Sequence, residues 1–567
     1  MGKSVSMNYV PGELCVAASA VPGLDPARQY DEVARLINDG LAALLRSQVQ
    51  EPRDSLERDL SPVALRRWFP QHPEALRPLD RLKEPGQDLA PARTVAFGPR
   101  DAPTWAVHCY QIGGPQDPPD LRTELVRELT LLLNGRLRAA PDRADVTKVG
   151  GLLATSPNWL TVGAPSGSGE ASPGARPSPA PAGQWSFFFR DPRLNELVER
   201  ATDPNVVVAV LDTSPSARQV AAAAARFSGN RLLQRVVDPV AAVRLEEPLS
   251  VPTAYFAPHL GDVVPGWREG RSGVLPDDSA YLMPDHGLFA AGIVRDLAPS
   301  AEVHLLRVLS DYGVGDLLAI THVLSRLPDL FLTDPKRRLV VNLSLVADLP
   351  PSEELLEFWL PNTARDPKTL IPRFADVCSI LGAIHGCLSR TIDWVAQHRD
   401  RVLIVAAAGN DALGRPLRPE PRLPARYDDV LGVAAVRRSG QAASFSNRGD
   451  AVVMGNGVAV LGGNALPDPV NPTTRSPVVD TTTSPADAVV GIFSADRLPI
   501  DGQPNESGWV FWAGTSFATP IASAIAADVW ATEPGLSADA VVARVRGFQS
   551  ASNSDLEVPA IAATQSP

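Results

Sequence analysis

Short apolar segments alternate with helix-like segments from residue 206 to residue 436, and this alternation constrains the fold more than any other feature of the sequence. Continuous apolar runs of this length are typical of strands buried on both faces, as in a parallel sheet that helices cover from both sides. The sequence therefore predicts a three-layer α/β fold with a doubly wound, mostly parallel sheet. The strand-like segments are 206–211, 303–308, 339–345, 402–407 and 430–436, and the helix-like segments between them are 288–296, 317–327 and 374–397.

A stretch rich in Pro, Ser, Gly and Ala at 164–184 contains no large apolar residue. Such a segment cannot bury enough surface to fold alone, so it is predicted to be a linker. The chain then divides into a domain at 1–163 and a larger one at 185–567. Apolar periodicity predicts a small α+β unit for the first domain. Its strand-like runs are 14–18 and 105–112, and its helix-like runs are about 30–45 and 121–137.

Charge and apolar runs narrow the range of partners. The formal net charge is −11, and the Lys and Arg residues form no basic stripe. Nucleic acid is therefore not an expected partner, because phosphate binding relies on clustered basic side chains. No apolar run approaches the ~18 residues that a membrane span needs, so we expect no membrane segment.

The cysteines and the first residues bear on the cellular compartment. Cys15, Cys109, Cys378 and Cys387 are too few and too scattered for a disulfide framework, and they lack the spacing of zinc ligands. Cys15 and Cys109 could meet across strands, but free thiols fit the pattern better. The first residues lack the uninterrupted apolar core of a secretory signal. We therefore expect a cytoplasmic protein.

Four residues stand where chemistry is expected in such a sheet. Asp212 ends the first strand-like segment, Asn410 follows a later one, and His286 and Ser516 each open a helix-like segment. Ligand sites of parallel sheets form at the carboxyl ends of strands. Each residue also has a plain alternative: Asp212 and Ser516 as caps, Asn410 as a turn residue, and His286 as a structural histidine. Individually these signals are weak.

Taken together, the four motifs resemble those of the subtilisin-like serine protease family. The blocks DTS, HGLFAAG, AAGN and GTSFATP stand in the order of the family patterns D-[ST]-G, H-G-T-H-x-A-G, A-A-G-N and G-T-S-M-A-x-P. The order Asp, His, Ser is that of subtilisin. The resemblance extends over most of residues 200–530 and implies a subtilisin-like peptidase domain over 185–567.

Several departures from the family pattern limit what it implies. Ser214 replaces the glycine of the first block, Phe289 replaces the second histidine, and Ile521 replaces the histidine after the proline. Val346 stands where a glycine usually ends the substrate strand, so we expect the S1 and S4 subsites to be reshaped. Calcium-site motifs of secreted members are not recognisable, and no metal or organic cofactor is implied.

The resemblance implies a mechanism and a substrate cleft. Ser516 is the expected nucleophile, His286 its base, Asp212 the partner of the histidine, and Asn410 a donor to the oxyanion. A peptide substrate is expected to lie extended between two backbone edges, with an S1 wall at its end. The implied substrate-binding residues are Gly313 and Gly315 on one edge, Ser344, Leu345 and Val346 on the other, and Ala407, Ala408 and Gly409 in S1.

The segment before the linker ends in LLATSPNWLTVG, which resembles the end of a subtilisin-like propeptide. Residues 1–163 are therefore expected to be a propeptide-like domain that restrains the enzyme, with the extended stretch Thr155–Val162 lying along the substrate strand. The alternative is an unrelated domain that binds a regulatory protein partner. For the chain as a whole, the leading hypothesis is an active serine endopeptidase. The second hypothesis is a catalytically silent protein that binds peptides or partners on the same fold.

Overall fold

Among the residues that the structure describes, the large sheet has nine strands, of which eight are parallel and one, β21, is antiparallel. The computed structural model describes residues 9–21, 23–46, 63–79, 94–98, 103–114, 116–139, 152–162, 174–245, 282–347, 385–450, 455–468, 477–499, 502–548, 551–553 and 555–567. The strands in spatial order are β21 (Ala551–Asn553), β22 (Val558–Ile561), β16 (Val458–Leu461), β15 (Val430–Val436), β14 (Val402–Ala407), β12 (Arg338–Leu343), β8 (Val206–Asp212), β10 (Glu302–Arg307) and β9 (Arg244–Leu245). The predicted mostly parallel α/β sheet is confirmed.

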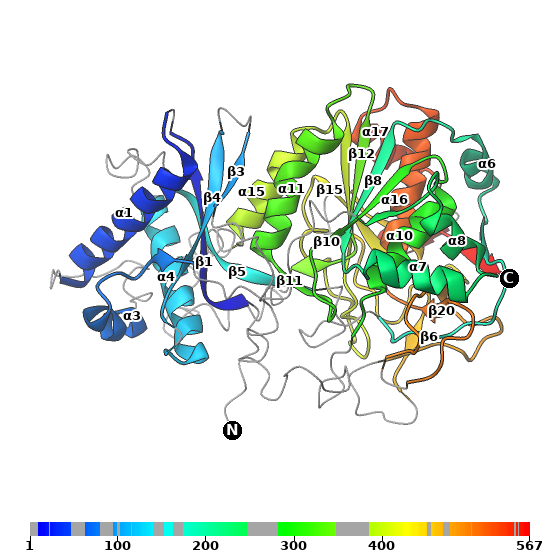
Figure 1. The fold of residues 1–567 in the computed structure, drawn as a ribbon, viewed down its shortest axis with the longest axis horizontal. Coiled ribbons are helices and arrows are strands. Elements are labelled where there is room, and N and C mark those ends of the chain that lie inside the picture. The colour runs from blue at the N-terminus through cyan, green and yellow to red at the C-terminus, as the bar shows by residue number, and fades with distance from the viewer. Residues whose placement is uncertain are drawn as a thin grey trace.

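Helices cover both faces of this sheet because its central strands are apolar on both sides. In β8, Val208 and Val210 belong to one core, whereas Ala209 and Leu211 belong to another. Successive side chains of a strand point to opposite faces, so each core lies on its own side of the sheet. The first core contains α6 (Pro192–Arg200), α7 (Ala217–Arg226), α8 (Arg231–Val237), α10 (His286–Leu297), α16 (Thr515–Thr532) and α17 (Ala538–Arg546), and the second contains α11 (Leu317–Phe331) and α15 (Gly386–Ala396) (Figure 1).

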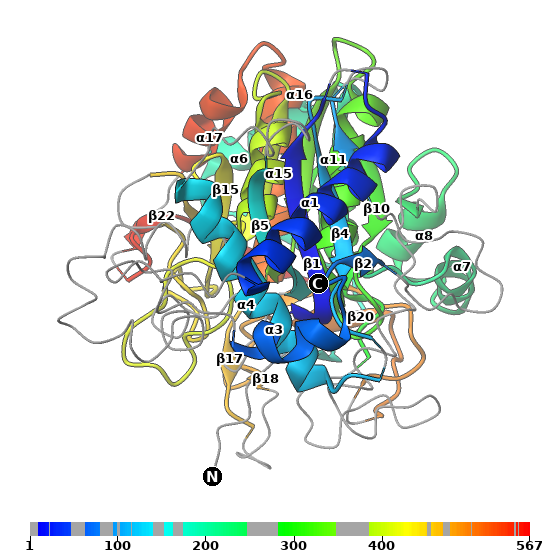
Figure 2. The same cartoon turned by 90° about the vertical axis from the view of Figure 1, so that its left-hand side faces the viewer.

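A second sheet, built mainly from the N-terminal residues, lies beside α11 and α15. We call the elements from β1 to β5 the N-terminal unit. Its strands are antiparallel, and α1 and α4 lie across the face turned away from the large sheet, which Figure 2 shows from that side. The elements are β1 (Tyr9–Ser19), α1 (Pro26–Arg46), α3 (Val63–Trp68), η1 (Phe69–Gln71), β2 (Arg77–Pro78), β3 (Thr94–Phe97), β4 (Trp105–Gln111), α4 (Pro119–Ala139) and β5 (Leu152–Val162).

One apolar core joins the N-terminal unit to the second face of the large sheet. It includes Leu14 of β1, Leu125 of α4, Leu324 of α11 and Leu388 of α15. Three cysteines also lie at this junction and form no disulfide: the Cys15 thiol donates to the Cys109 sulfur across the strands at 3.8 Å, and Cys387 is buried on α15. The fourth cysteine of the chain lies outside the described residues.

The described part of the predicted linker is packed against the protein. Ala175 N–H donates to the Ala513 carbonyl at 3.0 Å, and the indole of Trp512 donates to the Ala175 carbonyl at 2.7 Å. The linker was expected to span 164–184, and the part of it that the structure describes, 174–184, belongs to the folded body. Ala175 and Ala180 are both buried in the core on the first face of the sheet, which ties this segment to the large domain.

Short strands complete the structure around this packed segment. They pair in three small antiparallel sheets. The strands are β6 (Ser178–Pro179) with β20 (Trp509–Trp512) and β19 (Val489–Ile492), β7 (Ser186–Phe189) with β23 (Ala563–Ser566), and β17 (Ala465–Leu466) with β18 (Val478–Val479).

The helix expected at 374–397 is described only as α15, since 374–384 lie outside the described residues. The other predicted helices and strands overlap the elements observed in the structure. None of the helices in the described ranges is long and apolar enough to cross a membrane.

The buried helix α16 carries a carboxyl group at an unfavourable place. Asp528 is 1% exposed, and within the described residues neither of its oxygen atoms has a hydrogen-bond partner. Burial raises the pKa of this carboxyl well above its ordinary value. The unfolded chain ionises near pH 3.9, so folding retains a proton above that pH, and Asp528 increasingly destabilises the folded state as the pH rises.

We therefore expect Asp528→Asn to raise the free energy of unfolding at pH 7 by about 1 kcal/mol or more, because folding no longer requires a carboxylate to take up a proton, and each unit of raised pKa corresponds to about 1.4 kcal/mol. The gain should disappear near pH 4, where the native carboxyl is also neutral. Urea denaturation at several pH values measures both effects. Asp400→Asn, at a carboxylate that is 72% exposed, is the control and should change little. An equal gain at pH 4 and pH 7 would contradict this account.

Candidate functional site

The four residues singled out in the sequence come together at the carboxyl edge of the large sheet. Asp212 is the last residue of β8, and Asn410 follows the end of β14. His286 is the first residue of α10, and Ser516 the second residue of α16. All four side chains are fully buried. Parallel strands end at one edge, which is why residues far apart in the sequence meet there.

Asp212 and His286 are held in direct contact by the backbone around them. His286 Nδ1 lies 2.8 Å from Asp212 Oδ1, which also accepts a hydrogen bond from Thr213 N–H at 2.6 Å. The Thr213 hydroxyl donates to the Pro284 carbonyl at 2.9 Å and accepts from Gly287 N–H at 3.0 Å. One threonine thus ties the end of β8 to the start of α10.

Gly287 makes this approach sterically possible. A Cβ at position 287 would lie 2.1 Å from the Thr213 carbonyl oxygen and 2.8 Å from the Asp212 Cβ. No side chain fits at these distances. The glycine that follows the histidine in the motif therefore allows α10 to begin against the end of β8.

A second carboxylate, which the sequence motifs did not single out, fixes the start of α10. Asp285 is fully buried and accepts hydrogen bonds from Ser494 N–H at 3.1 Å, from Ala495 N–H at 3.0 Å and from the Ser494 hydroxyl. Burial raises the pKa of Asp285, although these donors oppose the shift. Its position directly before His286 was the one available signal.

His286 contacts the residue that follows Ser516, but His286 and Ser516 are not hydrogen bonded to each other. Among the described residues, no group pairs with His286 Nε2, and the imidazole contacts the rings of Trp512 and Phe517 at centroid distances of 5.5 and 5.1 Å. The Ser516 hydroxyl donates instead to the Ser344 carbonyl at 3.2 Å. Contacts of this kind commonly tighten only when a substrate binds.

A chain of hydrogen bonds fixes the backbone of Ser516 through Ser344, Asn342 and Ser523. The Ser344 hydroxyl donates to the Ser516 carbonyl at 2.8 Å and accepts from Asn342 Nδ2 at 2.9 Å. The Ser523 hydroxyl, two turns along α16, donates to Asn342 Oδ1 at 2.9 Å. Asn342 and Ser523 were missed in the sequence, although an asparagine inside an apolar strand is a visible signal.

Asn410 is anchored to the helix that carries Ser516. Its Oδ1 atom accepts hydrogen bonds from Thr515 N–H at 2.9 Å and from the Thr515 hydroxyl at 3.0 Å. Its Nδ2 atom lies 3.6 Å from the point that a Cβ on Gly514 would occupy. The amide is thus directed toward the start of α16, beside Ser516.

The two predicted edges of the cleft enclose a segment of the chain itself. β5 runs antiparallel between β11 (Val314–Asp316) and β13 (Val346–Ala347). Val162 pairs with Val314 on one side and with Val346 on the other, and Thr161 pairs with Gly315 and Ala347. Gly313 and Ser344 lie just outside the paired strands.

Side chains of β5 complete this packing. Leu160 packs against an apolar cluster of Val314, Val346 and Ala407. Val346 replaces the glycine of the family pattern and forms part of that cluster, so the surface beside β5 is apolar and branched. Leu345, by contrast, belongs to the core on the second face of the large sheet. Ala408 and Gly409 follow β14 toward Asn410.

Phe289, which replaces the second histidine of the motif, is fully buried against the aromatic residues around His286. Its ring lies 4.5 Å from that of Phe517 and 5.5 Å from that of Trp512, measured between centroids. In the ranges that the structure describes, no group of three His, Cys, Asp or Glu residues is arranged to hold a metal ion.

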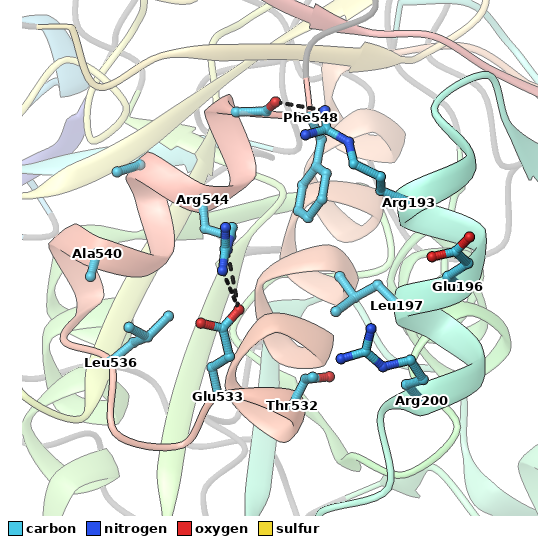
Figure 3. Close-up of a pocket in the computed structure, with 12 residues that line it drawn as sticks. Arg193, Glu196, Leu197, Arg200, Thr532, Glu533, Leu536, Ala540, Arg544 and Phe548 are labelled. Carbon is cyan, nitrogen blue, oxygen red and sulfur yellow. Dashed lines mark hydrogen bonds and ion pairs between the residues drawn. The ribbon is translucent and has the colours of Figure 1, made fainter.

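A cavity of about 580 Å³ lies between α6, α16 and α17, away from this site. Thr532, the last residue of α16, lines this cavity. Ser516 is at the other end of the helix, about 25 Å away at 1.5 Å per residue. The charged groups of the cavity are largely paired: Arg544 binds Glu533, and Arg193 donates to the Gly547 carbonyl and lies over the ring of Phe548 (Figure 3).

Comparison with known proteins places this geometry in context. Residues 203–554, more than half of the chain, match the family model described as the subtilase family. Over 176 residues the chain is 27% identical to the minor extracellular protease Epr of Bacillus subtilis (strain 168), a match that covers 30% of this chain and 20% of Epr. The chain thus spans about a fifth of the length of that curated relative. A solved structure of a lanthipeptide protease matches with a TM-score of 0.39 and 15% identity, over 67% of this chain and 97% of that one.

The contact between Asp212 and His286 should depend on the absence of a side chain at position 287. We expect Gly287→Ala to displace α10, lengthen the 2.8 Å contact and lower the free energy of unfolding by about 1–3 kcal/mol, as overpacking does. Urea denaturation and a crystal structure of the variant measure these effects. Gly535→Ala is the matched control, since no atom lies within 4 Å of its added Cβ. Equal stability of the two variants would show that α10 tolerates the methyl group.

Proposed function

The chain belongs to the subtilase family, and on this premise we propose that it is a serine endopeptidase that hydrolyses peptide bonds through an acyl-enzyme. The observation that carries the proposal is the meeting of Asp212, His286, Ser516 and Asn410 at one edge of the sheet, with Asp212 and His286 in contact at 2.8 Å. The substrates are proteins or peptides.

In this proposal Ser516 attacks the carbonyl carbon of the scissile bond, and His286 Nε2 takes up the hydroxyl proton. A serine hydroxyl needs such a base because it is a weak nucleophile at neutral pH. Asp212 keeps the Nδ1 proton on the side facing β8 and stabilises the imidazolium without taking up a proton itself. His286 then returns its proton to the leaving amine, and water hydrolyses the acyl-enzyme by the reverse sequence.

The oxyanion of the tetrahedral intermediate is stabilised by Asn410 Nδ2 and by the backbone N–H of Ser516. Thr515 supports this role, because its N–H and hydroxyl bind Asn410 Oδ1 and so orient the amide. Donors fixed before the reaction stabilise the developing charge without a reorganisation penalty.

An extended peptide fits the cleft because both of its edges are strands with pairing capacity. β11 and β13 pair with β5 of the same chain at Val162 and Thr161. A substrate that takes the place of β5 forms the same backbone hydrogen bonds, which give affinity with little sequence choice. The chain as it stands therefore holds its own segment where a substrate is expected.

We extend the proposal to regulation: the N-terminal unit restrains the peptidase by keeping β5 in the cleft. The pairing of β5 with both edges and the burial of His286 and Ser516 support this. A tethered segment has an effective concentration in the millimolar range, so it competes strongly with free substrate. A regulatory protein partner that binds the N-terminal unit is one route to release.

Ser516→Ala should abolish peptide hydrolysis, with a loss of about 10⁴-fold or more, and leave the fold intact. His286→Ala should be equally damaging, because the two residues act as one unit. Both variants should also lose labelling by a fluorophosphonate, which reacts only with an activated serine. If the wild-type chain is not labelled after β5 has been released, the protein is a catalytically silent peptide-binding member of the family.

Release of β5 should raise activity. We propose to insert the recognition sequence of a specific protease within residues 164–173, ahead of the described segment that starts at 174, and to cut the folded chain. Hydrolysis of a fluorogenic peptide should rise about tenfold or more after the cut and fall when excess N-terminal fragment is added.

A point variant tests the same idea without a cut. Leu160→Asp places a charge against the apolar cluster of Val314, Val346 and Ala407, so the uncut chain should gain activity. Val63→Asp, at a half-exposed position on α3, is the matched control and should have no effect. Because one core joins the N-terminal unit to the large sheet, the unit can stay bound after the cut. Equal rates before and after the cut, together with no gain in Leu160→Asp, would refute the restraint while leaving the peptidase assignment intact.

A further inference from the structure

A buried ion pair lies directly beyond Asn410. Arg422 Nε donates to Asp411 Oδ2 at 2.8 Å and Arg422 Nη2 donates to Asp411 Oδ1 at 2.7 Å, so the contact is bidentate. The side chains are only 10% and 3% exposed. Burial opposes ionisation of Asp411, but the charge and hydrogen bonds of Arg422 outweigh it and hold the pKa of this carboxyl below its usual value.

Asn447 connects the ion pair to the backbone before Asn410. Its Nδ2 atom donates to Asp411 Oδ2 at 2.8 Å and to the Ala408 carbonyl at 3.1 Å, and its Oδ1 accepts from Asp411 N–H at 2.8 Å. Its own N–H donates to the Gly409 carbonyl at 3.0 Å, and Arg422 N–H donates to the Ala408 carbonyl at 2.9 Å. The turn at 408–411 is therefore held on both sides of Asn410.

The network also lies in van der Waals contact with the turn. Gly409 has φ +105°, in the region that favours glycine. A Cβ there would lie 2.7 Å from Asn447 Nδ2 and 3.1 Å from both Arg422 Cγ and Asp411 Oδ2. Any displacement of the ion pair is thus transmitted to the backbone that carries Asn410.

We propose that Arg422, Asp411 and Asn447 are positioning residues that set the direction of the Asn410 amide. Thr515 fixes the outer end of that amide, and the network fixes its backbone. A bidentate arginine–carboxylate contact suits this role, because its two parallel hydrogen bonds define an orientation as well as a distance. This inference rests on the proposed role of Asn410 as an oxyanion donor.

The expected effect is on kcat. Donors stabilise the oxyanion only at the right distance from the position it will occupy, and a displacement of about 1 Å can lower the rate by about 10²-fold. Backbone pairing of the substrate depends instead on β11 and β13, to which the three network residues do not belong. The network does bind the carbonyls of Ala408 and Gly409, which are implied to line S1. A positioning role therefore predicts that kcat falls by more than KM rises.

The test uses the full chain, cut within residues 164–173 after folding. Its variants are two changes in the network, one control outside it, and a combination with Asn410→Ala. Arg422→Lys keeps the charge but loses the fork that binds both carboxylate oxygens. The double variant Asp411→Asn/Arg422→Met removes both charges, so no lone charge remains buried. Both should lower kcat, the double variant by about tenfold to hundredfold, with KM within about threefold of wild type.

Arg337→Met is the matched control. It breaks an ion pair with Glu302 at 2.8 Å near the opposite edge of the large sheet, and its kcat should match wild type. Urea denaturation of each variant reports on folding. If the double variant does not fold, Arg422→Lys decides the question.

A double-mutant cycle that combines Asn410→Ala with Asp411→Asn/Arg422→Met separates positioning of the Asn410 amide from a general structural effect. Asn410→Ala alone should lower kcat by about 10²–10³-fold. If the network acts through Asn410, the double variant should lower kcat little further in that background. The same loss in both backgrounds, or an unchanged kcat in both network variants, would overturn the proposal. A cut wild-type chain that neither hydrolyses peptides nor takes up fluorophosphonate would instead overturn the proposed function on which it rests.

Discussion

A helix buried on every side, α16, is the element on which the rest of the structure depends. Every residue from Thr515 to Ala531 is buried, and the helix packs against five strands of the large sheet and against α6, α10 and α17. Small side chains such as Ala518, Ala522 and Ala526 allow so close an approach. Since Ser516 opens this helix, its position is fixed by the packing of the whole sheet.

The second constraint is the need to satisfy the backbone groups of the cleft. β11 and β13 are short edges, and unpaired edge groups are costly unless water or another strand takes them up. In this chain β5 supplies that strand, and the same strand continues the sheet of the N-terminal unit. The N-terminal unit and the two strands expected to bind substrate thus share one hydrogen-bonded sheet, which makes the proposed restraint a property of the backbone.

Four buried carboxyl groups differ in whether other groups donate hydrogen bonds to them. Asp212 contacts His286, Asp285 accepts three donors from 494–495, and Asp411 pairs with Arg422. Each is next to a proposed catalytic residue and is held by groups that fix its direction. Asp528 has no such partner among the described residues, and it lies far along α16 from Ser516. Burial with partners orients a group, whereas burial without partners only destabilises the fold.

The sequence by itself determined the parallel sheet, the helices on both faces and the four residues at its carboxyl edge. Local signals sufficed there, because apolar periodicity reports burial and the end of a strand reports the edge where Asp212 and Asn410 lie. The roles of those residues remain predictions. The stretch 155–162 was also expected along the substrate strand, but only the tertiary structure decided that β5 pairs with both β11 and β13 and that residues 174–184 pack against the large domain. It also revealed Asp285 at Ser494 and Arg422 at Asp411. The physical reason is that these contacts join residues that lie far apart in the sequence or belong to no recognisable motif. Charge pairing and close packing depend on distances in space, which no local periodicity encodes.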